Sequence, residues 1–253
     1  MTPSLGSPTG VRALARLLRE PTLLAFDYDG TLAPICADTA SARVDAAWTT
    51  RLRRIARRWP VAVISGRSLA DVACRLGFEA SFIAGNHGAE SSAAHPALNV
   101  MSRLDAARAA LAGHSDSLSG AGVAIEDKGM SLAVHYRNAN CPSRAAQMVA
   151  ALLSGLPDEL VVSHGKAVFN ITVAAASDKG DALRCAMRAC GVRQALYVGD
   201  DVNDEPAFLA AKASPQSVTV RVGSRLAATH ARFALSTQSR VGGLLRALAA
   251  WPH

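Results

Sequence analysis

The sequence places two aspartates, Asp27 and Asp29, after the apolar run 23–26 and before Gly30 and Thr31. Two carboxylates in such a position repel each other and lose solvation, which is costly unless a cation lies beside them. Asp27 is a candidate nucleophile that could attack phosphorus to form an aspartyl phosphate. Asp29 is a candidate general acid that could protonate the leaving alkoxide and later take a proton from water. A polar turn after a strand uses the same residue types, so the motif alone leaves both interpretations open.

A second acidic segment, residues 199–205, follows the apolar run 195–198 and contains Asp200, Asp204 and Glu205. Mg²⁺ prefers oxygen ligands and usually takes one or two carboxylates together with phosphate and water. An acidic loop that caps the next helix would account for Asp204 and Glu205 but not for Asp200. We therefore predict a Mg²⁺ site that includes Asp200.

Two smaller motifs supply groups that could bind a phosphate. Ser65-Gly66-Arg67 follows an apolar run, and a hydroxyl, an unhindered backbone N–H and a helix start can together hold an anion. An ordinary loop with a helix N-cap is the alternative. Lys179 follows Asp178 as the first residue of another predicted helix. The helix dipole disfavours a cation in the first turn of a helix. This penalty suggests that Lys179 neutralises the carboxylates and the phosphate; the alternative is an exposed residue behind an N-cap.

Mixed charges gather in the middle of the chain, where Glu126 and Lys128 precede the segment 135–137, His-Tyr-Arg. These groups could form surface salt bridges or an array of donors and acceptors for sugar hydroxyls, and the residue types do not choose between the two. His87 lies between glycines in the loop 85–90, just before this middle region, where it could face a substrate.

Short apolar runs alternate with helical patterns, which predicts a parallel α/β sheet. The predicted strands are Leu23–Asp27, Val61–Ile64, Ser81–Ala84, Ala195–Val198 and Ser217–Val222. The predicted helices are Ala42–Trp59, Leu69–Leu76, Lys179–Cys190, Asp204–Lys212 and Val241–Trp251. Ligands collect at the carboxyl ends of strands in such sheets, so Asp27, Ser65 and Asp200 should share one edge.

The middle region follows another pattern. It reads as helix, two strands, helix and two strands, namely Leu98–Leu111, Gly122–Glu126, Ser131–Tyr136, Ser143–Leu153, Glu159–Ser163 and Ala167–Val173. Glycines between the paired strands favour tight hairpin turns. We therefore predict a catalytic core formed by residues 1–94 and 177–253, and a smaller α+β domain formed by residues 95–176 and inserted into it.

Composition limits the possible partners. The 253 residues are 50% hydrophobic and carry a formal net charge of +7, which allows one or two packed domains and favours acidic ligands. In and just before the basic run 51–59, the apolar residues Trp48, Leu52, Ile55 and Trp59 recur at helical spacing. The arginines should therefore lie on the solvent side of a helix, and no nucleic-acid partner is expected.

The five cysteines are scattered and odd in number, which argues against a disulfide framework or a zinc site and for a reducing compartment. The first ten residues lack an apolar run of signal-peptide length, and no segment approaches the length of a membrane span. We expect a cytoplasmic protein with no membrane contact.

Taken in order, four motifs resemble the haloacid dehalogenase superfamily of Mg²⁺-dependent phosphotransferases. They are Asp27-Tyr28-Asp29-Gly30-Thr31, Ser65-Gly66-Arg67, Lys179 and Gly199-Asp200-Asp201. Asp29 points to the phosphatases and mutases of this superfamily. The segments 27–35, 85–90, 126–131 with 135–137, and 199–205 further resemble the trehalose-6-phosphate phosphatases.

The resemblance implies a Rossmann-like parallel-sheet core with an inserted smaller α+β cap domain that sets substrate specificity. It also implies that Mg²⁺ is held by Asp27, the backbone carbonyl of Asp29 and Asp200. Asp204 would support Lys179 or the surroundings of the metal. The cap would close over the core and exclude water while the phosphoryl group is transferred.

The same resemblance assigns the binding residues. The phosphoryl group would be held by Ser65 and Lys179, the sugar that carries no phosphate by Glu126 and Lys128, and the cleft would be lined by Arg67 and His87. Two positions depart from the family pattern. The last strand of the insert carries Asn170 nearest to an expected glutamate and lacks the arginine that follows it, and Asn203 replaces a usual threonine. Asn170 is the remaining candidate for the sugar site.

The resemblance therefore predicts an enzyme that hydrolyses trehalose 6-phosphate to trehalose and phosphate through an aspartyl phosphate. A phosphatase for another sugar phosphate, of sucrose or glycosylglycerate type, and a non-catalytic subunit that senses sugar phosphates are the alternatives. The filled catalytic positions argue against the sensor. We expect a monomer, and an association with a synthase stays open.

Overall fold

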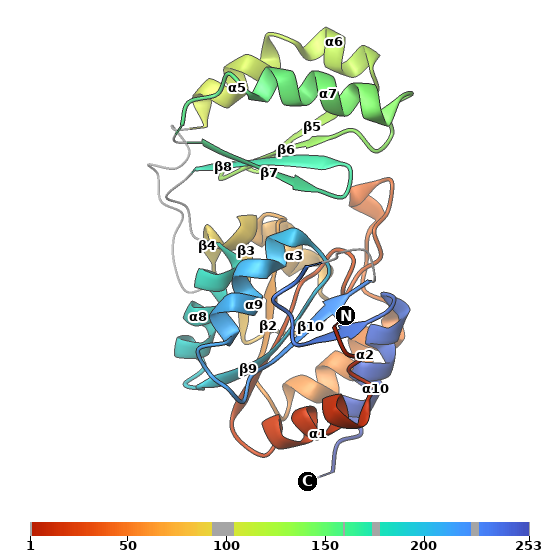
Figure 1. Cartoon of the computed structure of the whole chain (residues 1–253), viewed down its shortest axis with the longest axis vertical. Helices are drawn as coiled ribbons and strands as arrows, with labels where there is room; N and C mark the ends of the chain where they lie inside the picture. Colours follow the sequence, from red (N-terminus) through yellow and green to blue (C-terminus); the bar gives the residue numbers. More distant parts are fainter. Residues whose placement is uncertain (1, 93–103, 159, 174–177, 224–227, 253) are drawn as a thin grey trace. The chain divides into compact units, whose positions relative to one another are not determined.

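The computed structural model describes the whole chain except residues 1, 93–103, 159, 174–177, 224–227 and 253. The chain divides into two units (Figure 1). The first unit comprises Met1–Ala94 and Ser177–His253, and the second unit comprises His95–Ala176.

Apolar runs form the sheet of the first unit, whose strand order is β11-β10-β9-β1-β2-β3-β4. The strands are β1 (Thr22–Phe26), β2 (Val61–Ile64), β3 (Phe82–Gly85), β4 (Glu90–Ser91), β9 (Gln194–Gly199), β10 (Val218–Val222) and β11 (Phe233–Leu235). Neighbouring strands run parallel, except that β4 is antiparallel to β3. The predicted α/β class with a parallel sheet is confirmed.

Helices cover both faces of this sheet. They are α1 (Pro8–Leu17), α2 (Ala46–Ala56), α3 (Leu69–Arg75), α8 (Lys179–Ala189), α9 (Glu205–Ala211) and α10 (Ser239–Ala249), with the short 3-10 helices η1 (Thr39–Ser41), η2 (Asn86–Gly88) and η3 (Val202–Asp204). Leu24 and Phe26 of β1 belong to the core that includes α1, α2 and α10, whereas Leu23 and Ala25 belong to the core with α8 and α9. Burial on both faces explains why the strands read as unbroken apolar runs.

The described residues of the second unit form an antiparallel sheet of order β5-β6-β8-β7 together with helices (Figure 1). Its elements are α5 (Asp105–Ala112), α6 (Ser115–Gly120), β5 (Ala124–Asp127), β6 (Leu132–His135), α7 (Pro142–Leu153), β7 (Leu160–Gly165) and β8 (Val168–Val173). Phe169 and Ile171 of β8 pack in one core with the helices, so Asn170 between them lies on the other face of the sheet. Glu126, Ala133 and Asn170 are register partners across β5, β6 and β8, so Glu126 shares that face.

Several element boundaries differ from the prediction. Helix α2 begins at Ala46 and not at Ala42, because the Asp45 side chain accepts hydrogen bonds from the backbone of Ala47 and Trp48 and caps the helix there. The sequence reasoning missed α1, although Ser7 and Pro8 carry an N-cap and first-turn signal. It also missed α6 and the short strands β4 and β11. The first residues of the helix predicted from Leu98 lie outside the described residues.

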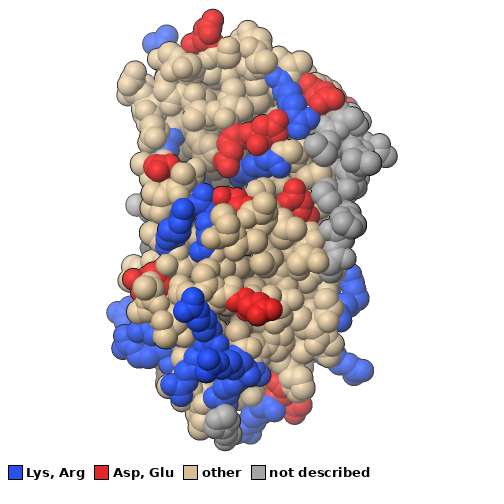
Figure 2. Space-filling view, turned by 180° about the vertical axis from the view of Figure 1, so that it is seen from behind, with Lys and Arg blue, Asp and Glu red and all other residues tan. Residues whose placement is uncertain are grey.

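The basic run of α2 is only partly a solvent face. Arg53, Arg54 and Arg57 are exposed, but Arg51 donates to the Gly242 carbonyl and Arg58 to those of Trp251 and Pro252. The prediction that all these arginines face solvent was therefore wrong, because Arg51 connects α2 to α10 and Arg58, just after α2, contacts the segment behind α10. Figure 2 shows basic side chains gathered toward one end of that view. Among the described residues, no helix is long and apolar enough to cross a membrane.

Candidate active site

Three neighbouring strands place the predicted site residues at one edge of the first unit's sheet. β1 lies between β9 and β2, with Phe26 in register with Val198 on one side and Val63 on the other. The backbone N–H of Asp27 donates to the Val198 carbonyl at 2.8 Å. Asp27, Ser65 and Asp200 thus follow the carboxyl ends of adjacent strands, where parallel sheets place their ligands.

Lys179, the first residue of α8, connects two of the acids. Its Nζ lies 2.8 Å from Asp27 Oδ1 and 2.6 Å from Asp204 Oδ1. The Lys179 side chain is 3% exposed, so it is a buried cation and not the exposed first-turn residue of the alternative interpretation. Asp178 does cap the helix, because its side chain accepts from the Asp181 N–H at 2.9 Å.

The pKa shifts in this cluster follow from burial and from close charges. Burial raises the pKa of Asp27 well above its usual value, Lys179 opposes this, and the charges of Asp204 and Asp200 add to it. Burial would also raise the pKa of Asp204, but Lys179 outweighs it and the net pKa is lowered. Burial would lower the pKa of Lys179, but its two carboxylate partners raise it. Lys179 is therefore protonated at any physiological pH.

The two oxygens of Asp204 are held by other groups. Oδ1 accepts from Lys179 and, at 2.8 Å, from the hydroxyl of Tyr197, while Oδ2 accepts from the Asp201 backbone at 2.9 Å. Tyr197 was missed by the sequence reasoning. A hydroxyl inside a buried strand needs a partner, and that requirement was the available signal.

The donor set fits a divalent cation. Ligand oxygens of Asp27, Asp200 and Asp204 lie within 4.8 Å of one another, and all three residues are buried. Three buried carboxylates lie near a single ammonium group, that of Lys179. A bound cation would balance the remaining negative charge of the carboxylates. Since Asp204 is engaged by Lys179, Tyr197 and Asp201, Asp27 and Asp200 are the acids best placed to bind the metal.

Two glycines let the acidic segments approach each other. A Cβ at Gly30 would overlap the carboxylate of Asp200, and a Cβ at Gly199 would overlap that of Asp204. Gly30 also has a φ of 80°, which other residues rarely adopt. The glycine after Asp29 is thus a requirement of the site and not only a turn signal.

Ser65 and His87 lie together in the first unit. Ser65 is buried, its Oγ accepts from the Arg67 N–H at 3.1 Å, and its carbonyl accepts from the His87 N–H at 2.9 Å. A Cβ at Gly66 would lie 2.6 Å from the His87 ring, so the imidazole covers the phosphate-binding loop that the sequence predicts. His87 has a φ of 58°, and this left-handed conformation turns the chain beside Ser65.

Asp29 and Arg67 form a two-pronged ion pair. Arg67 Nε lies 2.7 Å from Asp29 Oδ2, and Nη2 lies 2.7 Å from Asp29 Oδ1. The Arg67 side chain is 8% exposed and that of Asp29 is 39% exposed. The arginine expected to line a cleft is thus held by the candidate general acid.

The sugar-site candidates lie on the second unit's sheet or next to it. Glu126 Oε2 lies 3.0 Å from His135 Nε2 and 3.8 Å from Lys128 Nζ. Asn170 shares the face of Glu126. The ion pairs of the salt-bridge interpretation are present, and the role of these residues in sugar binding stays a prediction.

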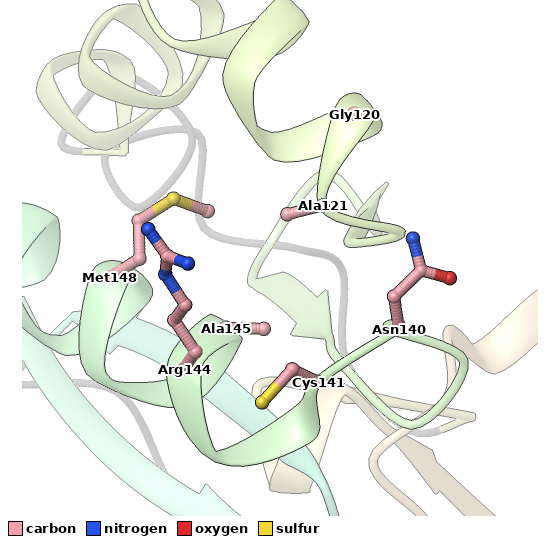
Figure 3. Close-up of a pocket in the computed structure, with 7 residues that line it drawn as sticks. All are labelled: Gly120, Ala121, Asn140, Cys141, Arg144, Ala145 and Met148. Carbon is pink, nitrogen blue, oxygen red and sulfur yellow. The ribbon is translucent and has the colours of Figure 1, made fainter.

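A cavity of about 510 Å³ in the second unit is not part of this set (Figure 3). Its lining comes from α6, α7 and the segment before α7, and includes Cys141, Arg144 and Met148. None of the predicted site residues lines it, and most of its wall is apolar.

The fold is one that solved structures of the haloacid dehalogenase class share. In agreement, the chain superposes on a Bacteroides thetaiotaomicron protein studied among the phosphatases of the haloalkanoate (HAD) superfamily, with a TM-score of 0.62, 17% identity and coverage of 90% of this chain and 93% of the other. The C-terminal domain of Candida albicans trehalose-6-phosphate phosphatase superposes with a TM-score of 0.85 over 98% of both chains at 23% identity.

The sequence comparisons narrow the class to a family. The trehalose-phosphatase family matches residues 25–239. The trehalose-phosphate phosphatase of Mycobacterium avium is 37% identical over 248 residues, which cover 91% of this chain and 62% of that protein. The chain belongs to the trehalose-phosphatase family, and it spans about three fifths of the length of its mycobacterial relatives.

Proposed function

We propose that the protein hydrolyses trehalose 6-phosphate to trehalose and inorganic phosphate. Membership of the trehalose-phosphatase family supports this substrate. The observation that carries the chemistry is the buried pair of Asp27 and Lys179, 2.8 Å apart and adjoined by Asp200. A buried carboxylate fixed beside a cation is suited to attack a phosphorus atom whose negative oxygens the same cation attracts.

In the first step, an oxygen of Asp27 forms a bond to phosphorus while the bond from phosphorus to the sugar oxygen breaks. Asp29 gives a proton to the leaving oxygen, and trehalose departs. In the second step, water attacks the phosphorus of the aspartyl phosphate and gives its proton to Asp29. The bond between phosphorus and Asp27 breaks, which releases phosphate and restores both acids.

Ser65 and Lys179 are proposed to hold the phosphoryl oxygens during both steps. Asp204 and Tyr197 keep Lys179 in place from the other side. Asp27 and Asp200, with the backbone carbonyl of Asp29, would bind Mg²⁺, which neutralises phosphoryl charge when bound. In the second unit, Glu126, Lys128 and Asn170 would bind the sugar that carries no phosphate. His87 would contact the substrate from the loop beside Ser65.

A phosphate-release assay over a panel of mono- and disaccharide phosphates tests the proposal. We expect turnover of trehalose 6-phosphate with Mg²⁺, its loss with EDTA and its return when Mg²⁺ is added. Equal turnover of many sugar phosphates would contradict the substrate. Binding of trehalose 6-phosphate without phosphate release would favour the sensing subunit. The monomeric state, the cytoplasmic location and a synthase partner stay predictions.

A further inference from the structure

A chain of ion pairs runs from Asp29 into helix α3. Arg67 binds both oxygens of Asp29 through Nε and Nη2. The same guanidinium donates through Nη2 to the Thr39 carbonyl at 2.9 Å and through Nη1 to Asp71 Oδ2 at 2.8 Å. All three nitrogens of Arg67 are therefore engaged by groups of the first unit, and the guanidinium also lies 5.3 Å from the ring centre of Tyr28.

Asp71 also forms an ion pair with Arg75. Its Oδ1 lies 2.5 Å from Arg75 Nε, so each Asp71 oxygen has its own arginine partner. Arg75 Nη1 then donates to the Ala40 carbonyl at 2.7 Å. The chain of pairs starts at Asp29 and ends on the segment 39–42, which Arg67 also contacts through Thr39.

The contacts fix the orientation of Arg67. A guanidinium is planar, so bonds to Asp29, Asp71 and a carbonyl in different directions leave it one orientation. Because Arg67 binds Asp29 with two parallel bonds, the orientation of the guanidinium sets that of the Asp29 carboxylate. An arginine that binds the substrate would instead be expected to keep some N–H groups directed at the substrate.

We propose that Asp71 and Arg75 are positioning residues for Asp29, acting through Arg67, and that Arg67 serves to place the general acid and not to bind the sugar. This inference rests on the proposed function. Proton transfer needs the acid within hydrogen-bond reach of the leaving oxygen, and a displacement of about 1 Å can cost about a hundredfold in rate. Neither Asp71 nor Arg75 is placed in contact with substrate.

The test compares Asp71→Asn and Arg75→Gln with the wild type. Arg184→Gln is the matched control, since it removes an arginine to aspartate pair at 2.7 Å on α8 of the same unit. With trehalose 6-phosphate we expect kcat to fall by about tenfold to a hundredfold in the two α3 variants. KM should stay near the wild-type value, and the control should change neither constant. Urea unfolding of each variant identifies any that does not fold, in which case the other α3 variant decides.

A second readout separates positioning from general damage. p-Nitrophenyl phosphate has a leaving group that needs no proton, so its first-step burst should be nearly unchanged in Asp71→Asn. The burst of trehalose from trehalose 6-phosphate should slow. Equal slowing of both bursts, or an increase in KM at constant kcat, would overturn the inference. If the wild type is active and Asp71→Asn and Arg75→Gln are equally active, the positioning inference is overturned and the proposed function stands. If the folded wild type has no phosphatase activity, the proposed function is overturned as well.

Discussion

The edge of the first unit's sheet and the polar face of the second unit's sheet, defined by Glu126, His135 and Asn170, use charged groups in different ways. At the edge, buried Asp27 and Asp204 each hold Lys179 at 2.8 Å or less. On the polar face, half-buried Glu126 has His135 at 3.0 Å and Lys128 at 3.8 Å. Removing charge from a buried network leaves an uncompensated ion, whereas water can replace a partner on a half-buried face. Substitutions of charged residues at the edge should therefore destabilise the protein strongly, and those on the polar face should destabilise it less.

Lys179→Met gives the largest expected difference between the two regions. It leaves the buried carboxylates of Asp27 and Asp204 without their cation, which should cost about 3–5 kcal/mol of unfolding free energy. Phosphatase activity should fall by about a hundredfold or more. Urea unfolding and steady-state phosphate release measure both effects. The comparison fails if Lys128→Met in the second unit destabilises the protein equally.

Gly30→Ala tests how closely the acidic segments must approach. The substitution combines a φ of 80° with an overlap between the new Cβ and Asp200. Gly191→Ala is the control, because Gly191 has a φ of 65° but no atom near its Cβ position. Both should lose about 1–2 kcal/mol of stability through backbone strain, and Gly30→Ala alone should lose activity. Similar activity losses in the two variants would assign the effect to strain and not to Asp200.

Glu126→Gln should act on substrate binding. If Glu126 accepts a sugar hydroxyl, its loss should raise KM for trehalose 6-phosphate by about tenfold and leave kcat nearly constant. Asp116→Asn, an exposed acid on α6, is the control. A fall in kcat without a change in KM would mean that Glu126 belongs with the chemistry, and the contrast between the regions would not hold.

The smallest expected effect is the pH dependence of two partly exposed aspartates, Asp71 and Asp127, that are paired with arginines. Burial alone would raise the pKa of Asp71, but Arg67 and Arg75 have the larger effect, so that this pKa is lowered. In the second unit, Arg108 lowers the pKa of Asp127. Because the folded pKa values of the two aspartates lie below the unfolded value of about 3.9, their ion pairs stabilise fully above that pH. The contribution is lost as the pH falls through the folded pKa.

Urea unfolding from pH 7 to pH 2 measures this dependence. The difference in stability between the wild type and Asp71→Asn should be constant near neutral pH and shrink below about pH 4. The loss should be larger for Asp71→Asn than for Asp127→Asn, because Asp71 has two arginine partners and is 28% exposed against 47%. A difference that grows on acidification would contradict the sign of the shifts.

The sequence revealed the central strands of the sheet because they are buried on both faces, and three of them, β1, β2 and β9, are followed by candidate site residues. Asp27, Ser65 and Asp200 could be assigned to one edge from the order of the strands alone. Lys179 could be linked to this cluster because a cation in a first helical turn needs a reason. In each case the sequence carries a local cost that only the tertiary arrangement removes.

Other features depend on contacts between distant segments, which have no local signature. Arg67 could be counted as a cleft residue, but its bonds to Asp29 and Thr39 arise from a segment about thirty to forty positions earlier in the chain. Arg51 and Arg58 looked like solvent-facing residues, although they donate to carbonyls near the C-terminus. Helix propensity and charge pattern contain no information about such partners.

Trapping of the phosphorylated enzyme tests the central claim, that Asp27 is the nucleophile for trehalose 6-phosphate. The protein is mixed rapidly with ³²P-labelled trehalose 6-phosphate, quenched in acid and reduced with borohydride, which converts an aspartyl phosphate to homoserine. The account predicts transient labelling of the wild type, homoserine at position 27 by mass spectrometry, and neither in Asp27→Asn. Labelling at another residue, or phosphate release by Asp27→Asn at the wild-type rate, would contradict it.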